Sequence, residues 1–326
     1  MKPLICAGLV AIFLFHSGLR IGAPQRTVAS TDTSGDKRTN TPFDGERAYQ
    51  YLKRQTDFGA RVPGSKAHEE CLRFLTSELK TFGGIVRVQT FAFTQPRLGR
   101  VMLSNIIAQY RPAERNRVAL TAHWDCRPWA DEDTDPVKRK SPVPGANDGA
   151  SGVAVLTELA REIAGDTTCA GVDVVLFDGE DMGTRGTLKS WCTGSKYFAA
   201  HLPHGFAPRF AINLDMVGDT YLSIPRERNS DRYAHDVMNL VFSTAKQIHA
   251  SAFVDVPGEE IYDDHVPLNE AGIKAIDLID FNYVNPQLNY WHTVEDTPDK
   301  CSAESLGEVG TVLFTIIHNI HRKGTP

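Results

Sequence analysis

Apolar residues recur at helical spacing in five stretches of the chain. This spacing places one apolar stripe on a helix, so each stretch predicts an amphipathic helix. Three of the five have a residue that can accept a hydrogen bond from a free backbone N–H at the helix start, namely Asp44, Ser65 and Ser230. The predicted helices cover about residues 44–55, 65–82, 153–163, 237–248 and 306–320.

Shorter apolar and β-branched runs lie between these stretches and predict strands. The first three follow one another with turn residues between them, whereas the later ones alternate with helices. Such alternation predicts an α/β fold with a single open, mostly parallel mixed sheet, helices on both faces and the early strands as an antiparallel flank. The predicted strands are 85–93, 101–110, 117–122, 172–177, 210–214 and 275–279.

The N-terminal residues have a different pattern. Lys2 precedes an apolar run from Leu4 to Phe15, which has the length of a signal-peptide core and is short for a membrane span. We predict a signal peptide or N-terminal anchor over residues 1–23, a disordered polar linker over 24–42 and a catalytic domain over 43–326. The protein is expected to be exported, to the periplasm or the extracellular space. Tethering by an uncleaved segment is the alternative.

Composition narrows the class of protein. The 326 residues are 41% hydrophobic and 23% charged, with a formal net charge of −5, so no basic excess indicates a nucleic-acid partner. We expect a monomer without a bundle of membrane-spanning helices. Five cysteines follow the N-terminal segment, which allows at most two disulfides, and the lack of a Cys-x-x-Cys pair argues against a structural zinc knuckle.

The predicted strand 172–177 leads directly into Asp178, Gly179, Glu180 and Asp181. Ligands of open α/β sheets bind at the carboxyl ends of strands. Two adjacent acids repel each other unless a cation or a proton separates their roles, so we interpret one of them as a metal ligand and the other as a group that moves a proton. The alternative is an acidic pair in a solvated loop or at a helix start.

Four more side chains of the same chemistry fall at strand ends or in the turns that follow, and these are His123, Asp148, Asp215 and His292. Imidazole and carboxylate ligands without thiolates suit zinc with one open coordination position. Three such ligands hold one metal, and five hold two metals that share a carboxylate. Asp148 is alternatively a helix cap, and His123 is alternatively a residue that orients a ligand without touching the metal.

Six motifs in a fixed order carry a resemblance to a known family. They are His123-x-Asp125, Gly145-Ala-Asn-Asp148-Gly-Ala-Ser-Gly152, Asp178-Gly-Glu180-Asp181, Asn213-Leu-Asp215, Asp263-Asp264-His265-x-Pro267 and Trp291-His292-Thr293. Over about residues 43–321 this set resembles the zinc exopeptidases of family M28, and within them the glutaminyl-peptide cyclotransferases, also called glutaminyl cyclases. The resemblance implies a zinc-exopeptidase-like fold.

The resemblance implies two ligand sets. The aminopeptidases of the family bind two zincs, and the matching residues here are His123, Asp148, Asp181, Asp215 and His292, with Glu180 as the general base. The cyclases keep a similar set but bind one zinc, through the positions matching Asp148, Asp181 and His292. One zinc is therefore expected, with two as the alternative.

Several features resemble the cyclases more than the aminopeptidases. These are the Asp263-Asp264-His265-x-Pro267 motif, the position of Trp291 directly before His292, and the loop from Phe58 to Ser65. Two departures stand beside them. Asp181 replaces the second Glu of the family's Glu-Glu pair, and the substrate-side Trp of animal cyclases matches residues 185–187, so whether Trp191 replaces it is open.

The expected function is therefore the cyclisation of an N-terminal Gln of a peptide or protein to pyroglutamate, with release of ammonia. The resemblance implies that Glu180 moves the proton, that Asp215 and Asp263 orient the leaving nitrogen and that Trp291 forms an apolar wall for the substrate. For Trp291, packing in the core is the alternative. The alternative functions are hydrolysis of N-terminal residues by a di-zinc aminopeptidase and, less favoured, a non-enzymatic exported binding domain.

Overall fold

The computed structural model describes residues 43–281 and 289–322. The predicted signal segment, residues 1–23, and the predicted linker, residues 24–42, lie outside the described residues. Their structure therefore stays a prediction. Among the described helices, none is long and apolar enough to cross a membrane.

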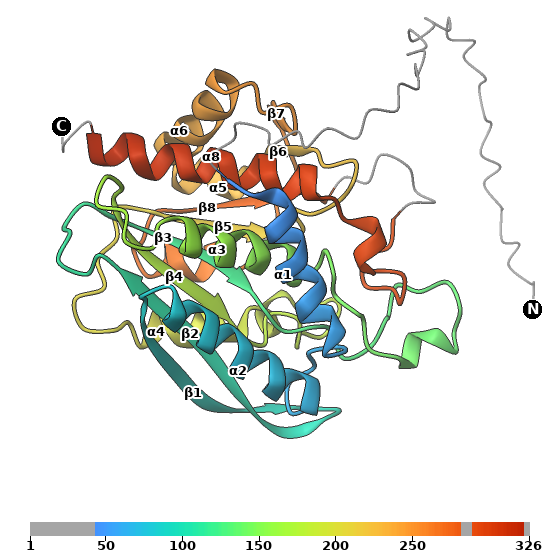
Figure 1. Ribbon diagram of the computed structural model, residues 1–326. Coiled ribbons are helices and arrows are strands. Elements are labelled where there is room, and N and C mark those ends of the chain that lie inside the picture. The colour runs from blue at the N-terminus through green and yellow to red at the C-terminus, as the bar shows by residue number, and fades with distance from the viewer. Residues whose placement is uncertain (1–42, 282–288, 323–326) are drawn as a thin grey trace, which may run out of the picture. The chain divides into compact units, whose positions relative to one another are not determined.

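Six strands form one open sheet in the order β1-β2-β4-β3-β5-β8 (Figure 1). β1 and β2 pair antiparallel, as do β2 and β4, whereas β4, β3, β5 and β8 run parallel to one another. This arrangement confirms the predicted mixed sheet with an early antiparallel flank. The strands are β1 (Ile85–Gln95), β2 (Gly99–Tyr110), β3 (Arg117–His123), β4 (Gly171–Phe177), β5 (Ala211–Asp215) and β8 (Ala275–Ile279). A separate parallel pair consists of β6 (Ile224–Arg226) and β7 (Phe253–Pro257).

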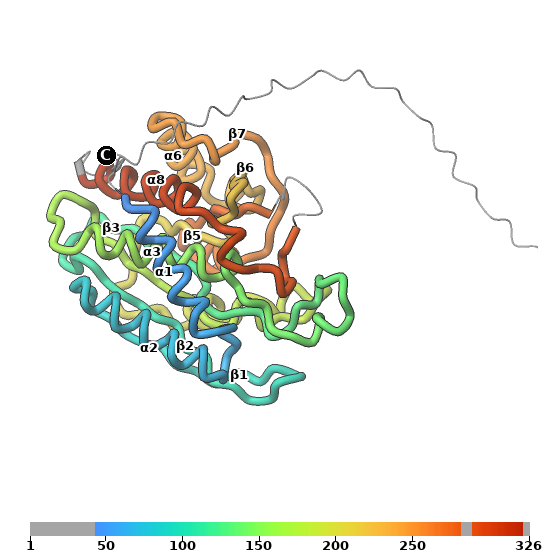
Figure 2. The backbone as a smooth tube through the Cα atoms, turned by 45° about the vertical axis from the view of Figure 1, so that its right-hand side comes forward, coloured from blue at the N-terminus to red at the C-terminus, as the bar shows by residue number. Residues whose placement is uncertain are grey.

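Alternate side chains of the central strands enter two different hydrophobic clusters, as the period of two along a strand requires. On β4, Val174 and Leu176 belong to the larger cluster and Val175 and Phe177 to the smaller one. The larger cluster is covered by α1 (Gly45–Asp57), α2 (Lys66–Thr81), α3 (Ala150–Glu162), α6 (His235–Gln247) and α8 (Ala303–Arg322). The smaller one is covered by α4 (Thr193–Ala200) and α7 (His265–Glu270). Helices therefore cover both faces, as predicted, and Figure 2 shows α1 beside α3 and α8.

The predicted helix starts are confirmed at two positions and wrong at a third. The Asp44 carboxylate accepts a hydrogen bond from the Arg47 N–H at 3.0 Å, and the Ser65 hydroxyl accepts one from the His68 N–H at 3.1 Å. Ser230 does not cap α6. It lies inside the short helix α5 (Arg228–Tyr233), where its N–H and hydroxyl both donate to the Glu227 carboxylate, so Glu227 is the residue that caps this segment.

The parallel strands bring their carboxyl ends to one edge of the sheet. β3 ends at His123 and β5 at Asp215, and β4 leads directly into the segment that holds Glu180 and Asp181. Because parallel strands end on the same side, residues far apart in the sequence meet at this edge. The five described cysteines are all buried, and none forms a disulfide.

Candidate active site

Five side chains predicted as metal ligands converge at the carboxyl edge of the sheet. His123 and Asp215 end neighbouring strands, Asp148 lies in the turn before α3, and Asp181 and His292 lie in loops. All five residues are buried. Asp148 does not cap α3, because the cap position is Gly149 and makes no side-chain hydrogen bond there. The Asp148 carboxylate is instead directed at two imidazoles.

The first half of this cluster consists of Asp148, Asp181 and His292, which we call the His292 group. The Nε2 atom of His292 lies 3.3 Å from Asp148 Oδ2 and 3.1 Å from Asp181 Oδ1. One imidazole nitrogen and two carboxylate oxygens thus face one another across distances that a single ion can span. Nitrogen and oxygen donors of this kind suit zinc.

The second half consists of His123, Asp148 and Asp215, which we call the His123 group. The Nε2 atom of His123 lies 3.1 Å from Asp148 Oδ1 and 3.2 Å from Asp215 Oδ1. Asp148 therefore belongs to both groups and presents one oxygen to each. This is the arrangement in which a carboxylate bridges two metals, although it equally permits one metal and one hydrogen-bonded histidine.

A buried oxygen without a partner tests whether a cation fits the site. Asp181 Oδ2 is buried and has no hydrogen-bond partner among the described residues. An unsatisfied buried carboxylate oxygen is costly unless a cation or a proton compensates it. In addition, one ligand atom each from His123, Asp148 and Asp181 lie within 4.8 Å of one another. The donor set and the unpartnered oxygen therefore fit a divalent metal.

Opposite charges within the cluster shift the pKa values of its members. Burial alone would lower the pKa of His292, but the carboxylates of Asp181 and Asp148 outweigh it and raise the pKa to about 9. Burial raises the pKa of Asp215 to about 7, against the effect of His123 and with a contribution from Asp263. The pKa of Asp148 lies well below its usual range, because hydrogen bonds to two histidines outweigh the effect of burial.

Glu180 lies beside the two groups and belongs to neither. Burial, followed by the charge of Asp181, raises the pKa of Glu180 well above its ordinary value. Ligand atoms of Glu180, Cys192 and Asp263 lie within 4.8 Å of one another. The Asp263 carboxylate is held in place by Asn213, whose side-chain amide donates a hydrogen bond to Asp263 Oδ2 at 3.0 Å. A second acid therefore lies next to the proposed proton-transfer group.

Two buried carboxylates hold the backbone of the ligand loops, and neither was assigned a role from the sequence alone. Asp125 accepts hydrogen bonds from the N–H groups of Glu180 at 3.1 Å and Asp181 at 3.3 Å. Asp296 accepts from the N–H of Asn147 at 2.8 Å and from that of Asp148 at 3.1 Å. The signal in the sequence that could have pointed to them is their position close to a predicted ligand, because Asp125 follows His123 by two residues and Asp296 follows His292 by four.

Two partly exposed tryptophans flank His292. The Trp291 ring stacks on the His292 ring at 3.9 Å and meets the Phe281 ring edge-on at 5.0 Å. The Trp191 ring lies nearly parallel to the His292 ring at 5.8 Å. The structure thus places Trp191 at the site, and Trp291 lies partly at the surface rather than in the core.

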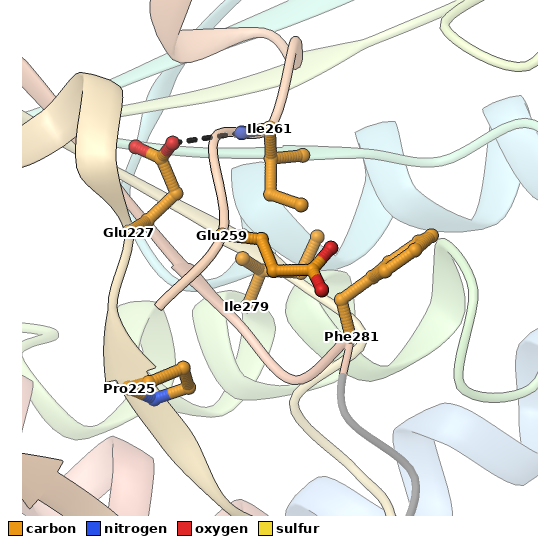
Figure 3. Close-up of a pocket in the computed structure, with 6 residues that line it drawn as sticks. All are labelled: Pro225, Glu227, Glu259, Ile261, Ile279 and Phe281. Carbon is orange, nitrogen blue, oxygen red and sulfur yellow. Dashed lines mark hydrogen bonds between the residues drawn. The ribbon is translucent and has the colours of Figure 1, made fainter. Parts of the chain in front are cut away.

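A hollow of about 210 Å³, part of it open to solvent, lies next to this edge of the sheet (Figure 3). Three connections tie it to the site: Ile279 pairs with Asp215 across the strands, Ile261 precedes Asp263 by two residues, and Phe281 contacts Trp291. Figure 3 shows the exposed Glu259 side chain with its carboxylate turned toward Phe281. The hollow combines apolar walls with two acidic side chains, the buried Glu227 and the exposed Glu259.

Comparison with known proteins places these residues in a family. The model of peptidase family M28 matches residues 105–317, which is more than half of the chain. The matched region includes every residue of the two groups and Glu180.

Two solved structures share the fold and differ in the activity that they are named for. The glutaminyl cyclase of Bacteroides thetaiotaomicron, solved with bound N-acetylhistamine, is 38% identical, has a TM-score of 0.81, and is matched over 86% of this chain and 99% of its own. A leucine aminopeptidase precursor from Bacteroides thetaiotaomicron VPI-5482 is also 38% identical with a TM-score of 0.81, over 85% of this chain and 97% of its own. Overall likeness therefore does not separate the two activities.

A characterised relative also has an aminopeptidase name. Aminopeptidase YwaD of Bacillus subtilis (strain 168) is 27% identical over 216 residues, which are 63% of this chain. The match spans 41% of the length of that relative. It supports the family and leaves the reaction to be argued from the site.

Proposed function

We propose a specific reaction for this chain, which belongs to peptidase family M28. It is a zinc-dependent glutaminyl-peptide cyclotransferase. It converts the N-terminal Gln of a peptide or protein to pyroglutamate and releases ammonia. The observation that carries this proposal is the pair of acids outside both ligand groups, Glu180 and Asp263, whose carboxylates lie within 4.8 Å of each other. Cyclisation needs a proton to leave one nitrogen and reach another, and two adjacent acids suit that transfer.

The His292 group is the proposed zinc site, with Asp148, Asp181 and His292 as ligands. Zinc bound there would act as a Lewis acid toward the γ-carbonyl oxygen of the substrate Gln. Asp181 has a shorter side chain than the Glu that the family places here. Its Oδ1 nevertheless lies 3.1 Å from His292 Nε2, so the shorter acid still reaches the other ligands.

Glu180 is the proposed proton-transfer group. It accepts the proton of the substrate α-amine as that nitrogen attacks the γ-carbonyl carbon, and it returns a proton to the departing amide nitrogen as the C–N bond breaks. A raised pKa suits this double role, because a general acid–base group works best when its pKa lies near the working pH. Asp263 and Asp215 are proposed to orient the leaving nitrogen as hydrogen-bond acceptors.

The aromatic residues beside His292 are the proposed substrate walls. Trp291 and Trp191 both present indole rings next to the ligand. An apolar wall favours the alkyl part of the Gln side chain and excludes the water that would hydrolyse the amide instead. Ring closure is intramolecular, so holding the amine close to the carbonyl supplies much of the rate.

A di-zinc aminopeptidase is the second candidate, and the geometry of the His123 group favours it. The Nε2 atom of His123 lies as close to Asp148 Oδ1 and to Asp215 Oδ1 as the Nε2 atom of His292 lies to its two carboxylates. With a metal in each group, Glu180 would activate a water between them. The two candidates thus differ in how many metals bind and in whether water is admitted.

The deciding experiment supplies the purified full chain, loaded with zinc, with two peptides that differ only in their first residue, Gln or Leu. A cyclase converts the Gln peptide to a product lighter by the mass of one ammonia and leaves the Leu peptide intact. Mass spectrometry measures both the loss of ammonia from the Gln peptide and the unchanged mass of the Leu peptide. Release of free Leu or free Gln would contradict the cyclase proposal and support the aminopeptidase.

A further inference from the structure

We propose that Cys192 is a positioning residue, whose thiol holds the Glu180 carboxylate in the orientation needed for proton transfer. This inference rests on the proposed role of Glu180 as general base. In the sequence, Cys192 is one of the five cysteines that could form disulfides. In the structure it is fully buried and unpaired with any other cysteine.

Cys192 contacts Glu180 at two points. Its Sγ lies 3.3 Å from Glu180 Oε1, which is a normal thiol hydrogen bond, and its backbone N–H donates to the Glu180 carbonyl oxygen at 3.1 Å. The neighbouring Thr193 N–H donates to the Gly179 carbonyl oxygen at 3.2 Å. The start of α4 is thus fastened to the backbone of the Glu180 loop, and the thiol extends this attachment to the carboxylate.

The backbone around Cys192 fixes the direction of the thiol. Cys192 has a φ of 56°, a left-handed conformation that few residues other than glycine adopt. It occupies the cap position of α4, yet its side chain makes no capping hydrogen bond. Two residues later, a Cβ on Gly194 would lie 2.3 Å from the Asp178 carbonyl oxygen, so the helix start is packed directly against the strand end. The strained conformation directs the thiol at Glu180 instead of the helix.

A thiol is well suited to hold a general base. It is a weak donor, so it orients a carboxylate without lowering the basicity of that carboxylate as an Arg or Lys would. Burial, followed by the charge of Glu180, raises the pKa of Cys192 well above its ordinary value, so the S–H remains available to donate. Among the described residues, Cys192 is the one whose side chain donates to the Glu180 carboxylate.

The neighbourhood of Glu180 explains why such a hold is needed. Asp181 and Asp263 carry like charges close to Glu180, and both act to raise its pKa. Without a hydrogen bond to hold it, the Glu180 side chain would rotate away from the neighbouring carboxylates, because their charges repel it. A displacement of about 1 Å in a reacting group costs on the order of 100-fold in rate.

The test compares Cys192→Ala and Cys192→Ser with Cys169→Ala as the matched control. Cys169 is also buried, but it precedes β4, at the opposite end of the strand from Glu180. We expect Cys192→Ala to lower kcat by about 10- to 100-fold with KM and zinc content unchanged. Cys192→Ser should recover part of that loss because a hydroxyl also donates, and Cys169→Ala should match the unmodified protein.

A double-mutant cycle with Glu180→Gln separates positioning from general damage. If Cys192 acts through Glu180, Cys192→Ala removes nothing further once Glu180 has lost its basicity. An equal loss in both backgrounds, an unchanged kcat in Cys192→Ala, or a Ser variant as impaired as the Ala variant would overturn the proposal. Circular dichroism checks folding, and Cys192→Gly, which adopts a positive φ freely and has no donor, replaces the Ala variant if that one unfolds.

The outcome is distinguishable from failure of the proposed function. If the unmodified protein hydrolyses peptides instead of cyclising Gln, the cyclase proposal fails, and the same variants are then assayed on the hydrolysed peptide. Glu180 is the expected base in that reaction too, so the double-mutant cycle still decides the role of Cys192.

Discussion

The His292 group and the His123 group share Asp148 and differ in what surrounds them. His292 stacks with two partly exposed indoles, those of Trp191 and Trp291, where a substrate can approach. Asp215 of the His123 group has buried acids beside it instead. The charge of Asp263 contributes to the raised pKa of Asp215, and the charge of Asp215 contributes to the raised pKa of Asp277. The difference suggests a division of labour. In the proposed reaction, a metal at the His292 group would face the substrate, and the acids beside the His123 group would handle protons.

The largest expected effect comes from Glu180, which belongs to neither group. Glu180→Gln removes the proton-transfer group and keeps the shape of the side chain, so turnover should fall by about 10²- to 10⁴-fold. Zinc content, measured by atomic emission on the same samples, should stay unchanged. Turnover within twofold of the unmodified protein would remove Glu180 from the reaction.

A matched pair of variants separates the two groups. Asp181→Asn removes a ligand charge from the His292 group and Asp215→Asn removes one from the His123 group. We expect zinc affinity to fall by more than about 100-fold in the first and by less than about tenfold in the second, judged against the effect of changing a ligand's supporting residue. Competition with a chelating dye measures both.

The stoichiometry in the same pair tests the one-metal assignment. The unmodified protein and Asp215→Asn should both bind close to one zinc per chain. Two zincs in the unmodified protein, reduced to one by Asp215→Asn, would show that both groups hold metal and would favour the aminopeptidase.

The support of the shared ligand should matter less than the ligands themselves. Asp296→Asn replaces one of the two oxygens that accept the N–H groups of Asn147 and Asp148 with an NH₂ group, which cannot accept. We expect zinc affinity to fall by about 10- to 100-fold. Asp299→Asn, at an exposed position of the 3-10 helix Pro298–Lys300, is the control, and an equal effect of both changes would contradict the role of Asp296.

Removal of the metal should lower stability. Buried acids repel one another, and a ligand that binds only the folded state at 100 times its Kd adds about 2.7 kcal/mol. We expect a chelator to lower the midpoint of urea unfolding and zinc to restore it. The loss should be absent in Asp181→Asn, because that variant binds zinc weakly from the start. A chelator effect of equal size in Asp181→Asn would place the stabilising metal elsewhere.

The smallest expected effect concerns the hollow beside the His292 group. Glu259 is exposed, so its attraction for a basic residue of the substrate is screened by solvent. A Gln peptide followed by basic residues should be favoured over an acidic one by about two- to fivefold in kcat/KM. Glu259→Gln should remove that preference and leave the turnover of a neutral peptide unchanged. A preference that survives in Glu259→Gln would show that another charge produces it.

The sequence predicted the sheet, most of its helices and all five residues of the two groups, because strand ends and ligand chemistry are local signals. It did not reveal α4, whose short segment opens with Thr193 and Gly194 and carries little helical periodicity. Nor did it reveal that Cys192 touches Glu180 or that Asp296 holds Asp148. These contacts depend on how separate loops fold back upon one another, and one sequence contains no trace of that pairing.

The hydrogen bonds of Asp296 have a consequence for how the protein matures. They join residues 149 positions apart in the chain. During synthesis, Asp296 and the nearby ligand His292 are both added long after Asp148. Until that segment has docked, Asp148 lacks His292, one of its two imidazole neighbours, and its N–H lacks the Asp296 carboxylate that accepts from it. The proposed metal site is therefore expected to be completed only after residue 296 has been synthesised and docked.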